Sequence, residues 1–396
     1  MKQGWATVAL AEVTKRISNW HPKTESGVFE YIDLSSVDQV RKVIKCSTTT
    51  PCDSAPSRAR QLVATGDVLV STVRPNLNGV AMVPDKFNGA TASTGFTVLR
   101  PTHLLHSNYL FHWVKGRTFI QAMVRQATGA SYPAVSDKVV KGSEIPLPSL
   151  DEQRRIAAIL DHVDTLRELR RDSSGKMHAL EGALLDRMAS CAGASTLRLD
   201  ELIDADDRIN YGVVQPGSNT VNGVPLIRIS DLRNDRVDRS SIKLIDPTVE
   251  SNYRRSRIRG TEILVGCVGT IGAVAITSPE DIGSNVARAV SRVPISDPVL
   301  RRYVASYLRS DGPQRYFRKE VRAVAQPTLN IKQLAATIVP VPPRAAQREF
   351  VAQVEHVDAL RSATERHLAD LDMLFASLQS RAFAGELDVS KVSPLP

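Results

Sequence analysis

The stretch Ile145-Pro-Leu-Pro-Ser-Leu-Asp-Glu-Gln-Arg-Arg-Ile-Ala-Ala-Ile-Leu160 joins an apolar segment with two prolines to the start of a heptad-patterned helix. A second version, Ile338-Val-Pro-Val-Pro-Pro-Arg-Ala-Ala-Gln-Arg-Glu-Phe350, occurs later in the chain. Their shared features are separated by a constant offset, because 340−146, 342−148, 347−153 and 350−156 all equal 194. A constant offset over four features indicates that the chain is one unit written twice.

Other landmarks repeat at nearly the same distance. The apolar run after Gly66 predicts a strand entered from a turn, and the run after Gly260 is its counterpart. A helix predicted from Asn108 towards Arg125 has its counterpart at Leu300. Between these landmarks the two halves have little in common, so we expect two similar scaffolds that carry different loops.

Heptad-spaced apolar residues predict two long helices, over residues 151–190 and 345–388. A helix of about 40 residues is roughly 60 Å long, and its apolar seam must be buried, so the other helix is the expected antiparallel partner. Ser174-Gly175 lowers helix propensity and predicts a kink or a solvated patch. The residues expected to pack helix on helix are Ile156, Val163, Leu166, Leu180, Leu184, Phe350, Val357, Leu360, Leu371, Leu374 and Leu378.

The predicted fold class is α/β (α+β), with two pseudo-symmetric globular domains separated by two long antiparallel coiled-coil helices. We expect the globular domains over residues 1–150 and 196–343. The helical repeats that follow them are expected over residues 151–195 and 344–390. A rigid spacer between two recognition units would act as a ruler, and for duplex DNA it predicts a target in two parts.

Composition bounds the class of protein. The 396 residues carry a formal net charge of +9, with a sequence pI of about 9.5, which favours an anionic partner, DNA or RNA before a membrane surface. No apolar run reaches the ~20 residues that span a bilayer, and the start of the chain lacks a signal-peptide pattern, so we expect a soluble, cytoplasmic protein. The four cysteines are scattered without a CxxC pair, which predicts reduced thiols and no zinc site.

Candidate DNA-binding residues lie in predicted loops and basic runs. Arginine and asparagine pair with guanine and adenine edges, and clustered arginines suit phosphates. Turn chemistry and solvated charge explain the same residues equally simply. The candidates are Arg74, Asn76, Asn78, Tyr132, Arg254, Arg255, Arg257, Arg259, Arg318, Arg322 and Gln326.

Motifs for catalysis are missing from the sequence. We find no Asn-Pro-Pro-Tyr methyltransferase motif, no Walker motif and no nuclease-like carboxylate cluster. His103 and His106 have metal-like spacing but no third ligand nearby, so no metal site is expected. These observations predict a chain without catalytic residues.

Taken together, the Ile145 stretch, its copy at Ile338 and the Gly66 and Gly260 strands resemble the specificity subunit of a type I restriction-modification system. The resemblance covers essentially the whole chain, and the second copy departs from the pattern at Pro343-Arg-Ala-Ala. It implies a non-catalytic subunit whose two target-recognition domains bind an asymmetric, bipartite duplex DNA site. It also implies docking of two modification (methyltransferase) subunits and of restriction subunits.

The same resemblance implies that this chain holds no cofactor, because S-adenosylmethionine, ATP and Mg²⁺ belong to the partner subunits. Two other classes of function stay open from the residues themselves. One is a stand-alone sequence-specific DNA-binding protein, and the other is a coiled-coil scaffold without a methyltransferase partner. Phosphate contacts make DNA affinity fall steeply with salt, which separates the scaffold from the other two.

Overall fold

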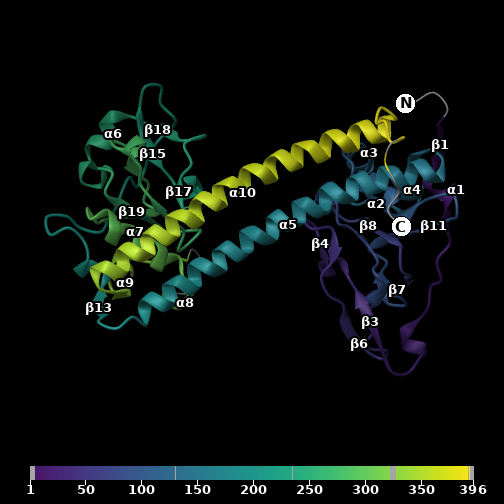
Figure 1. Ribbon diagram of the computed structural model, residues 1–396, viewed down its shortest axis with the longest axis horizontal. Coiled ribbons are helices and arrows are strands. Elements are labelled where there is room, and N and C mark those ends of the chain that lie inside the picture. Colours follow the sequence, from purple (N-terminus) through teal and green to yellow (C-terminus); the bar gives the residue numbers. More distant parts are fainter. Residues whose placement is uncertain (1–4, 130, 234, 322–326, 391, 393–396) are drawn as a thin grey trace. The chain divides into compact units, whose positions relative to one another are not determined.

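The protein is described by a computed structural model that covers residues 5–129, 131–233, 235–321, 327–390 and 392. Its two compact units are Met1–Asp172 with Glu365–Pro396 (unit 1) and Ser173–Thr364 (unit 2). Two long helices, α5 (Leu150–Ala189) and α10 (Arg344–Ala384), run through both (Figure 1). Each unit therefore contains one half of each long helix.

In unit 1 a short two-stranded sheet leads into α5. Strand β1 (Ala6–Ala9) pairs antiparallel with β12 (Glu144–Leu147), which directly precedes the helix. The side-chain amide of Gln153 then donates to the carbonyl oxygen of Pro148 over 3.0 Å. Pro148 lies between the end of β12 and the start of α5, so this contact satisfies a carbonyl outside both elements.

Unit 2 repeats this joint. Strand β13 (Ser195–Arg198) pairs antiparallel with β23 (Ile338–Val341), which leads into α10. Gln347 donates to the carbonyl oxygen of Pro342 over 2.8 Å, 194 residues after its counterpart. The substituted stretch Pro343-Arg-Ala-Ala therefore does not prevent the helix from starting at Arg344.

A buried tyrosine ties each joint to the neighbouring helix. The hydroxyl of Tyr109 donates to Pro146 over 2.9 Å, and that of Tyr303 donates to Pro340 over 2.6 Å. Burial raises the pKa of both phenols, so they act as hydrogen-bond donors at any physiological pH. Residues 194 apart thus make the same bond in both units.

Two four-stranded sheets form the globular part of unit 1. Their orders are β2-β11-β8-β9 and β6-β3-β10-β7. The strands are β2 (Thr14–Lys15), β3 (Val28–Ile32), β6 (Thr48–Pro51), β7 (Ala59–Leu62), β8 (Val68–Ser71), β9 (Val80–Met82), β10 (Thr91–Ser93) and β11 (Phe96–Pro101), and a hairpin adds β4 (Val37–Asp38) and β5 (Val43–Ile44). The helices are α1 (Leu10–Val13), α2 (Ser107–Lys115), α3 (Arg117–Gln126) and α4 (Asp137–Lys141).

Unit 2 has the related orders β14-β22-β19-β20 and β18-β15-β21. The strands are β14 (Asn210–Tyr211), β15 (Val224–Ile227), β18 (Lys243–Ile245), β19 (Glu262–Gly266), β20 (Val274–Ile276), β21 (Asn285–Val286) and β22 (Val290–Pro294), and a hairpin adds β16 (Leu232–Arg233) and β17 (Arg236–Val237). The helices are α6 (Pro247–Ser251), α7 (Pro298–Arg309), α8 (Asp311–Glu320) and α9 (Ile331–Ala335).

The predicted strands after Gly66 and Gly260 are β8 and β19, the centres of equivalent sheets. Each enters from a glycine with positive φ, +82° at Gly66 and +90° at Gly260. A side chain at either position would be strained, which explains why glycine recurs there. The predicted helix from Asn108 to Arg125 is interrupted, because Gly116 separates α2 from α3 with an extended backbone.

The two long helices are antiparallel within each unit. In unit 1 Arg167 of α5 bonds Asp372 of α10, while the earlier Arg155 bonds the later Ser390. In unit 2 Glu181 bonds Arg361, while the later Arg187 bonds Gln353. The predicted antiparallel pairing is confirmed, and α5 is helical without a break through Ser174-Gly175.

The seam between the helices follows a different frame from the predicted one. The buried apolar positions of α5 include Ile156, Leu160 and Val163, so the second of them lies four residues after the first and not three. In α10 the buried apolar positions with the same spacing include Phe350, Val354 and Val357. Of the predicted packing residues, Ile156, Val163, Phe350 and Val357 are buried, Leu184, Leu371 and Leu378 are partly buried, and Leu166, Leu180, Leu360 and Leu374 are exposed.

The predicted packing of Leu166, Leu180, Leu360 and Leu374 between the helices is therefore wrong. Charged or aromatic residues one position later take their places in the seam, Arg167 and Glu181 in α5 and Arg361 and Phe375 in α10. A leucine pattern cannot distinguish these two frames, because both place apolar residues every seven positions. The ion pairs that select the observed frame are formed between segments far apart in the sequence.

Candidate nucleic-acid interface

In unit 1 two predicted loop residues meet at the end of β8. The backbone N–H of Arg74 donates to Pro133 over 2.7 Å, which holds the loop after β8 against the loop before α4. The guanidinium of Arg74 then lies 4.8 Å from the centre of the Tyr132 ring. Tyr132 is 69% exposed and Arg74 is also exposed, so together they present a cation and an aromatic face to solvent.

The asparagines of this loop have separate roles. Asn76 is exposed within the turn after Arg74. Asn78 is buried, with φ of +46°, and its side-chain amide donates to Val114 at the end of α2 over 3.2 Å. The prediction that Asn78 contacts DNA is therefore corrected, because its side chain is used to hold the hairpin on the helix.

In unit 2 the basic run before β19 divides into two pairs. Arg257 bonds Glu250 through two nitrogen atoms, and Arg259 lies 3.4 Å from Asp207. Arg254 and Arg255 are exposed, and no carboxylate among the described residues lies within 4 Å of either guanidinium. Arg254 and Arg255 are thus the two arginines of the run that form no ion pair within 4 Å in the described part of the chain.

Two further arginines, which the sequence pattern did not single out, lie along the same edge. The side chain of Asn210 in the edge strand β14 donates to the carbonyl oxygen of Arg255, which places the basic run beside that strand. Arg208 precedes β14, and the backbone of Arg288 donates to Val213 just beyond it. Both arginines are exposed. Their common edge was not detectable because residues 208, 255 and 288 meet only through sheet pairing.

A buried ionic network fixes this edge. Arg292 of β22 is fully buried and bonds Asp207 over 2.7 Å and Glu262 over 3.0 Å. Burial alone would raise the pKa of Asp207, but the bond from Arg292 lowers it overall. Asp207 and Glu262 are thus engaged by Arg292, and of the two only Asp207 also contacts a surface arginine of this edge, Arg259.

The remaining candidates lie on α8 and beyond it. Arg318 is exposed on α8. Arg322 and Gln326 lie outside the described residues. Near them Thr328 forms a β-bridge with Val268 at the end of β19, as Ala134 does with Val73 in unit 1. The same two loops therefore meet at the end of the central strand in each unit.

Other kinds of site were also sought in the part of the chain that the structure describes. There, no group of three or more histidine, cysteine, aspartate or glutamate side chains is arranged to hold a metal ion. Its helices include none that is long and apolar enough to cross a membrane.

Comparison with known proteins places this architecture. A family model for the type I restriction modification DNA specificity domain matches residues 2–174 and again 200–371. The chain is 28% identical over 318 residues to the EcoBI specificity subunit of Escherichia coli, a match that covers 71% of this chain and 66% of that relative.

Solved structures agree over a longer span. One, from work on complex assembly and conformational transition of the type I R-M system, is 26% identical, covers 98% of this chain and 99% of its own, and has a TM-score of 0.59. An S subunit from M. genitalium, 15% identical over 96% of each chain with a TM-score of 0.54, shares the fold. The duplicated domain and its helical repeats thus show that this chain belongs to the family of type I restriction-modification specificity subunits.

Proposed function

We propose that the protein is the non-catalytic DNA-specificity subunit of a type I restriction-modification complex and binds a bipartite, asymmetric duplex target. Residues 1–150 and 196–343 are the two target-recognition domains, and residues 151–195 and 344–390 are the helical repeats that space them. The observation that carries the proposal is the repeated unit, in which equivalent joints present different charged loops. One scaffold with two different surfaces suits a target with two different halves.

The loops at the ends of β8 and β19 are proposed to read the target. Arg74 with Tyr132 in unit 1, and Arg254 with Arg255 in unit 2, are exposed and supply the side-chain types that contact base edges and phosphates. Asn76, Arg318, Arg322 and Gln326 remain candidates of the same kind. Arg257 and Arg259 are weaker candidates because carboxylates already neutralise them.

The exposed leucines of the long helices are proposed to dock the methyltransferase subunits. Leu166 and Leu374 belong to unit 1, and Leu360 and Leu180 belong to unit 2. The unit 1 pair Leu166 and Leu374 is equivalent to the unit 2 pair Leu360 and Leu180, because 360−166 and 374−180 both equal 194. Leu166 lies two residues from Asp164, which faces the globular domain through Lys115, so at 100° per residue this leucine points away from the domain. Two equivalent apolar surfaces suit two copies of one partner.

In the complex, S-adenosylmethionine, ATP and Mg²⁺ are proposed to bind the partner subunits, and restriction subunits are proposed to join the methyltransferase core. A cytoplasmic location follows from such a role. A map of methylated adenines in the genome, made with and without this protein, tests the proposal. We expect one bipartite motif to lose methylation when the protein is deleted, and an unchanged map would overturn it.

A domain exchange tests the division into two units. Replacing the residues before Ile145 with those of a relative should change one half of the methylated motif and leave the other half intact. If both halves changed together, the two-domain interpretation would be wrong. Leu166→Glu with Leu360→Glu should weaken co-purification of the methyltransferase, whereas exposed Glu365→Lys should not, and equal retention of the partner in both would exclude the leucine surface.

A further inference from the structure

Five segments of unit 1 are linked by hydrogen bonds into one connected piece of backbone whose side chains include no carboxylate. We call it the acid-free surface, and its segments are Thr14–Trp20, Pro56–Leu62, Thr72–Asn76, Ala92–Gly95 and Ser131–Ser136. They contain five cations, Lys15, Arg16, Arg58, Arg60 and Arg74, and no aspartate or glutamate. The rest of the chain mixes both signs, with 51 basic and 42 acidic residues in total, so the separation of charge here is notable.

Backbone hydrogen bonds link these segments one to the next. Leu62 donates to Ser18 over 3.0 Å, and Trp20 donates to Arg60 over 2.9 Å, so the first two segments run side by side in opposite directions. Thr94 donates to Arg58 over 2.8 Å. Thr72 donates to Gly95 over 2.9 Å and accepts from Val135 over 2.9 Å. The cations therefore lie on one connected piece of backbone and not on separate flexible loops.

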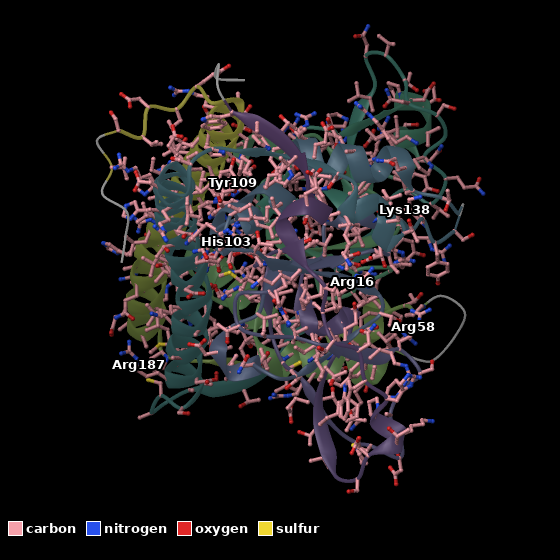
Figure 2. All side chains as sticks on the ribbon, turned by 90° about the vertical axis from the view of Figure 1, so that its right-hand side faces the viewer. Arg16, Arg58, His103, Tyr109, Lys138 and Arg187 are labelled. Atoms are coloured by element: carbon pink, nitrogen blue, oxygen red, sulfur yellow. The ribbon has the colours of Figure 1, made fainter. Side chains whose placement is uncertain are left out.

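The charges on this surface are available to a ligand. Lys15, Arg16, Arg58 and Arg74 are exposed, and Arg60 is half-buried. Within the described parts of the chain no carboxylate lies within 4 Å of any of these five cations, whereas Arg41 of the same unit has two and Arg100 has one. Figure 2 shows Arg16 and Arg58 on the side of unit 1 away from α5.

We propose that the acid-free surface binds the phosphate backbone of the DNA beside the half-site that unit 1 reads, with Arg16 and Arg58 as principal contacts. The inference rests on the proposed function and adds Lys15, Arg16, Arg58 and Arg60, none of which is among the base-reading candidates. The six residues from Lys15 to Trp20 include the end of β2 and a β-bridge at Asn19, and they span at most roughly 17 Å at about 3.3 Å per residue, which is enough for neighbouring phosphates. Ser18 and Asn19, which are both exposed, add neutral polar groups of the kind that bind phosphate oxygens.

An arginine that binds phosphate contributes affinity without sequence information. Removing it should weaken binding to every duplex alike and reduce the dependence on salt, by about 0.9 in the slope of log K against log salt for each phosphate contact. Arg74, stacked on Tyr132, lies at the border of the surface. There the proposed contacts to the DNA phosphates would adjoin the proposed contacts to bases. The two kinds of contact are therefore separable by measurement.

The test uses the assembled complex with its methyltransferase subunits and fluorescently labelled duplexes, one cognate and one scrambled, over a series of KCl concentrations. For Arg16→Ala with Arg58→Ala we expect the slope to fall in magnitude by about 1.8, with the preference for the cognate duplex unchanged. Arg16→Lys with Arg58→Lys should restore the wild-type slope, because a phosphate contact needs the charge and not the planar fork. The matched control is Arg117→Ala with Arg125→Ala, two exposed arginines on α3 of the same unit.

Each outcome bears on a different claim. If the wild-type complex does not bind duplex DNA, the proposed function fails. If the wild-type complex binds and the Arg16, Arg58 variant has the same slope as wild type, the phosphate tract is wrong while the proposed function stands. A selective loss for the cognate duplex would overturn the tract in favour of base reading, and loss of the methyltransferase from the variant complex would overturn it in favour of a protein contact.

Discussion

The two long helices contact each other at equivalent positions in the two units, but with different chemistry. We call the Arg167–Phe375 contact of unit 1 the apolar joint and the Arg361–Glu181 contact of unit 2 the charged joint. Arg167 in unit 1 and Arg361 in unit 2 are 194 residues apart, and so are Glu181 and Phe375, which meet those arginines. In unit 1 the guanidinium of Arg167 lies 4.5 Å from the centre of the Phe375 ring. In unit 2 that of Arg361 bonds Glu181 over 3.0 Å. At equivalent positions Arg167 thus meets an aromatic face and Arg361 meets a carboxylate, and Arg167 also bonds Asp372.

The difference between Phe375 in unit 1 and Glu181 in unit 2 is accompanied by differences in the surrounding charges. Glu181 also bonds Arg309 of α7, whose counterpart Lys115 in unit 1 pairs with Asp164 of its own joint. The hairpin tip that contacts the joint carries Asp235 in unit 2, 3.2 Å from Arg361, and Arg41 and Lys42 in unit 1. Burial and the charge of Lys115 lower the pKa of Lys42 to about 8. Each globular domain is therefore matched in charge to its own pair of helix halves.

The apolar joint should be the more costly one to break. Phe375→Ala removes a buried ring packed in the core of unit 1 and leaves Arg167 without its aromatic face, so we expect a loss of about 4 kcal/mol in the free energy of unfolding. All three tryptophans, Trp5, Trp20 and Trp113, belong to unit 1, so their fluorescence during urea unfolding reports on that unit. Phe375→Leu is the matched control, and an equal loss in both variants would contradict the role of the ring.

The charged joint should lose slightly less. Glu181→Gln keeps the shape but leaves Arg309 and Arg361 short of a partner in a largely buried site, and we expect a loss of about 3 kcal/mol. Far-ultraviolet circular dichroism should show the loss, whereas the tryptophan transition of unit 1 should move less. A shift of the tryptophan signal alone would contradict the assignment of Glu181 to unit 2.

The same carboxylate makes the charged joint sensitive to acid. Burial would raise the pKa of Glu181, but Arg309, Arg361 and Ser306 lower it to about 2, from an ordinary value of 4.5. Because the folded-state pKa is depressed, its contribution is fully present above about pH 4.5 and is lost as pH falls towards 2. Urea unfolding at several pH values should show a steeper acid dependence in wild type than in Glu181→Gln, and parallel curves would contradict this expectation.

The hairpin contacts should have the smallest effects and should differ between the units. The Arg41–Asp172 pair is 43% and 49% exposed, so Arg41→Ala should leave the free energy of unfolding essentially unchanged. Asp235 faces Arg309 and Arg361, which are far less exposed, so Asp235→Asn should cost about 1 kcal/mol. Asparagine keeps the positive φ of +66° at this position accessible, which makes the substitution a test of charge. Equal losses of unfolding free energy in the two variants would contradict the expected difference between the two hairpins.

Much of the scaffold could be predicted because it depends on local rules. Glycines at positions 66 and 260, prolines before each long helix and heptad-spaced apolar residues are recognisable without a partner. The break at Gly116 was missed because the residues on both sides favour a helix, and extended geometry at that glycine is set by packing of α2 and α3 in the core of unit 1. The seam frame was missed for a similar reason, since Arg167 and Glu181 do not look like core residues.

The candidate interface was predicted in part. The meeting of Arg74 with Tyr132 joins two loops that had been chosen separately, and Arg254 with Arg255 are free as a basic run suggests. Asn78 was misjudged because an asparagine in a turn has the same sequence signature whether it faces solvent or caps a neighbouring helix. Arg58 and Arg288 carried no signal, since each is a single arginine in an ordinary turn.

By itself the sequence determined the duplication, its 194-residue period, the two long helices and their antiparallel pairing, because periodicity and turn chemistry act over a few residues or through strict repetition. The tertiary structure alone decided which arginines keep a free charge and which face of each helix is buried. Those outcomes depend on whether a carboxylate from a distant segment comes within bonding distance, as Glu250 does for Arg257 and none does for Arg254 among the described residues. The sequence gives the number and positions of the charged residues, but the fold decides which of them form ion pairs.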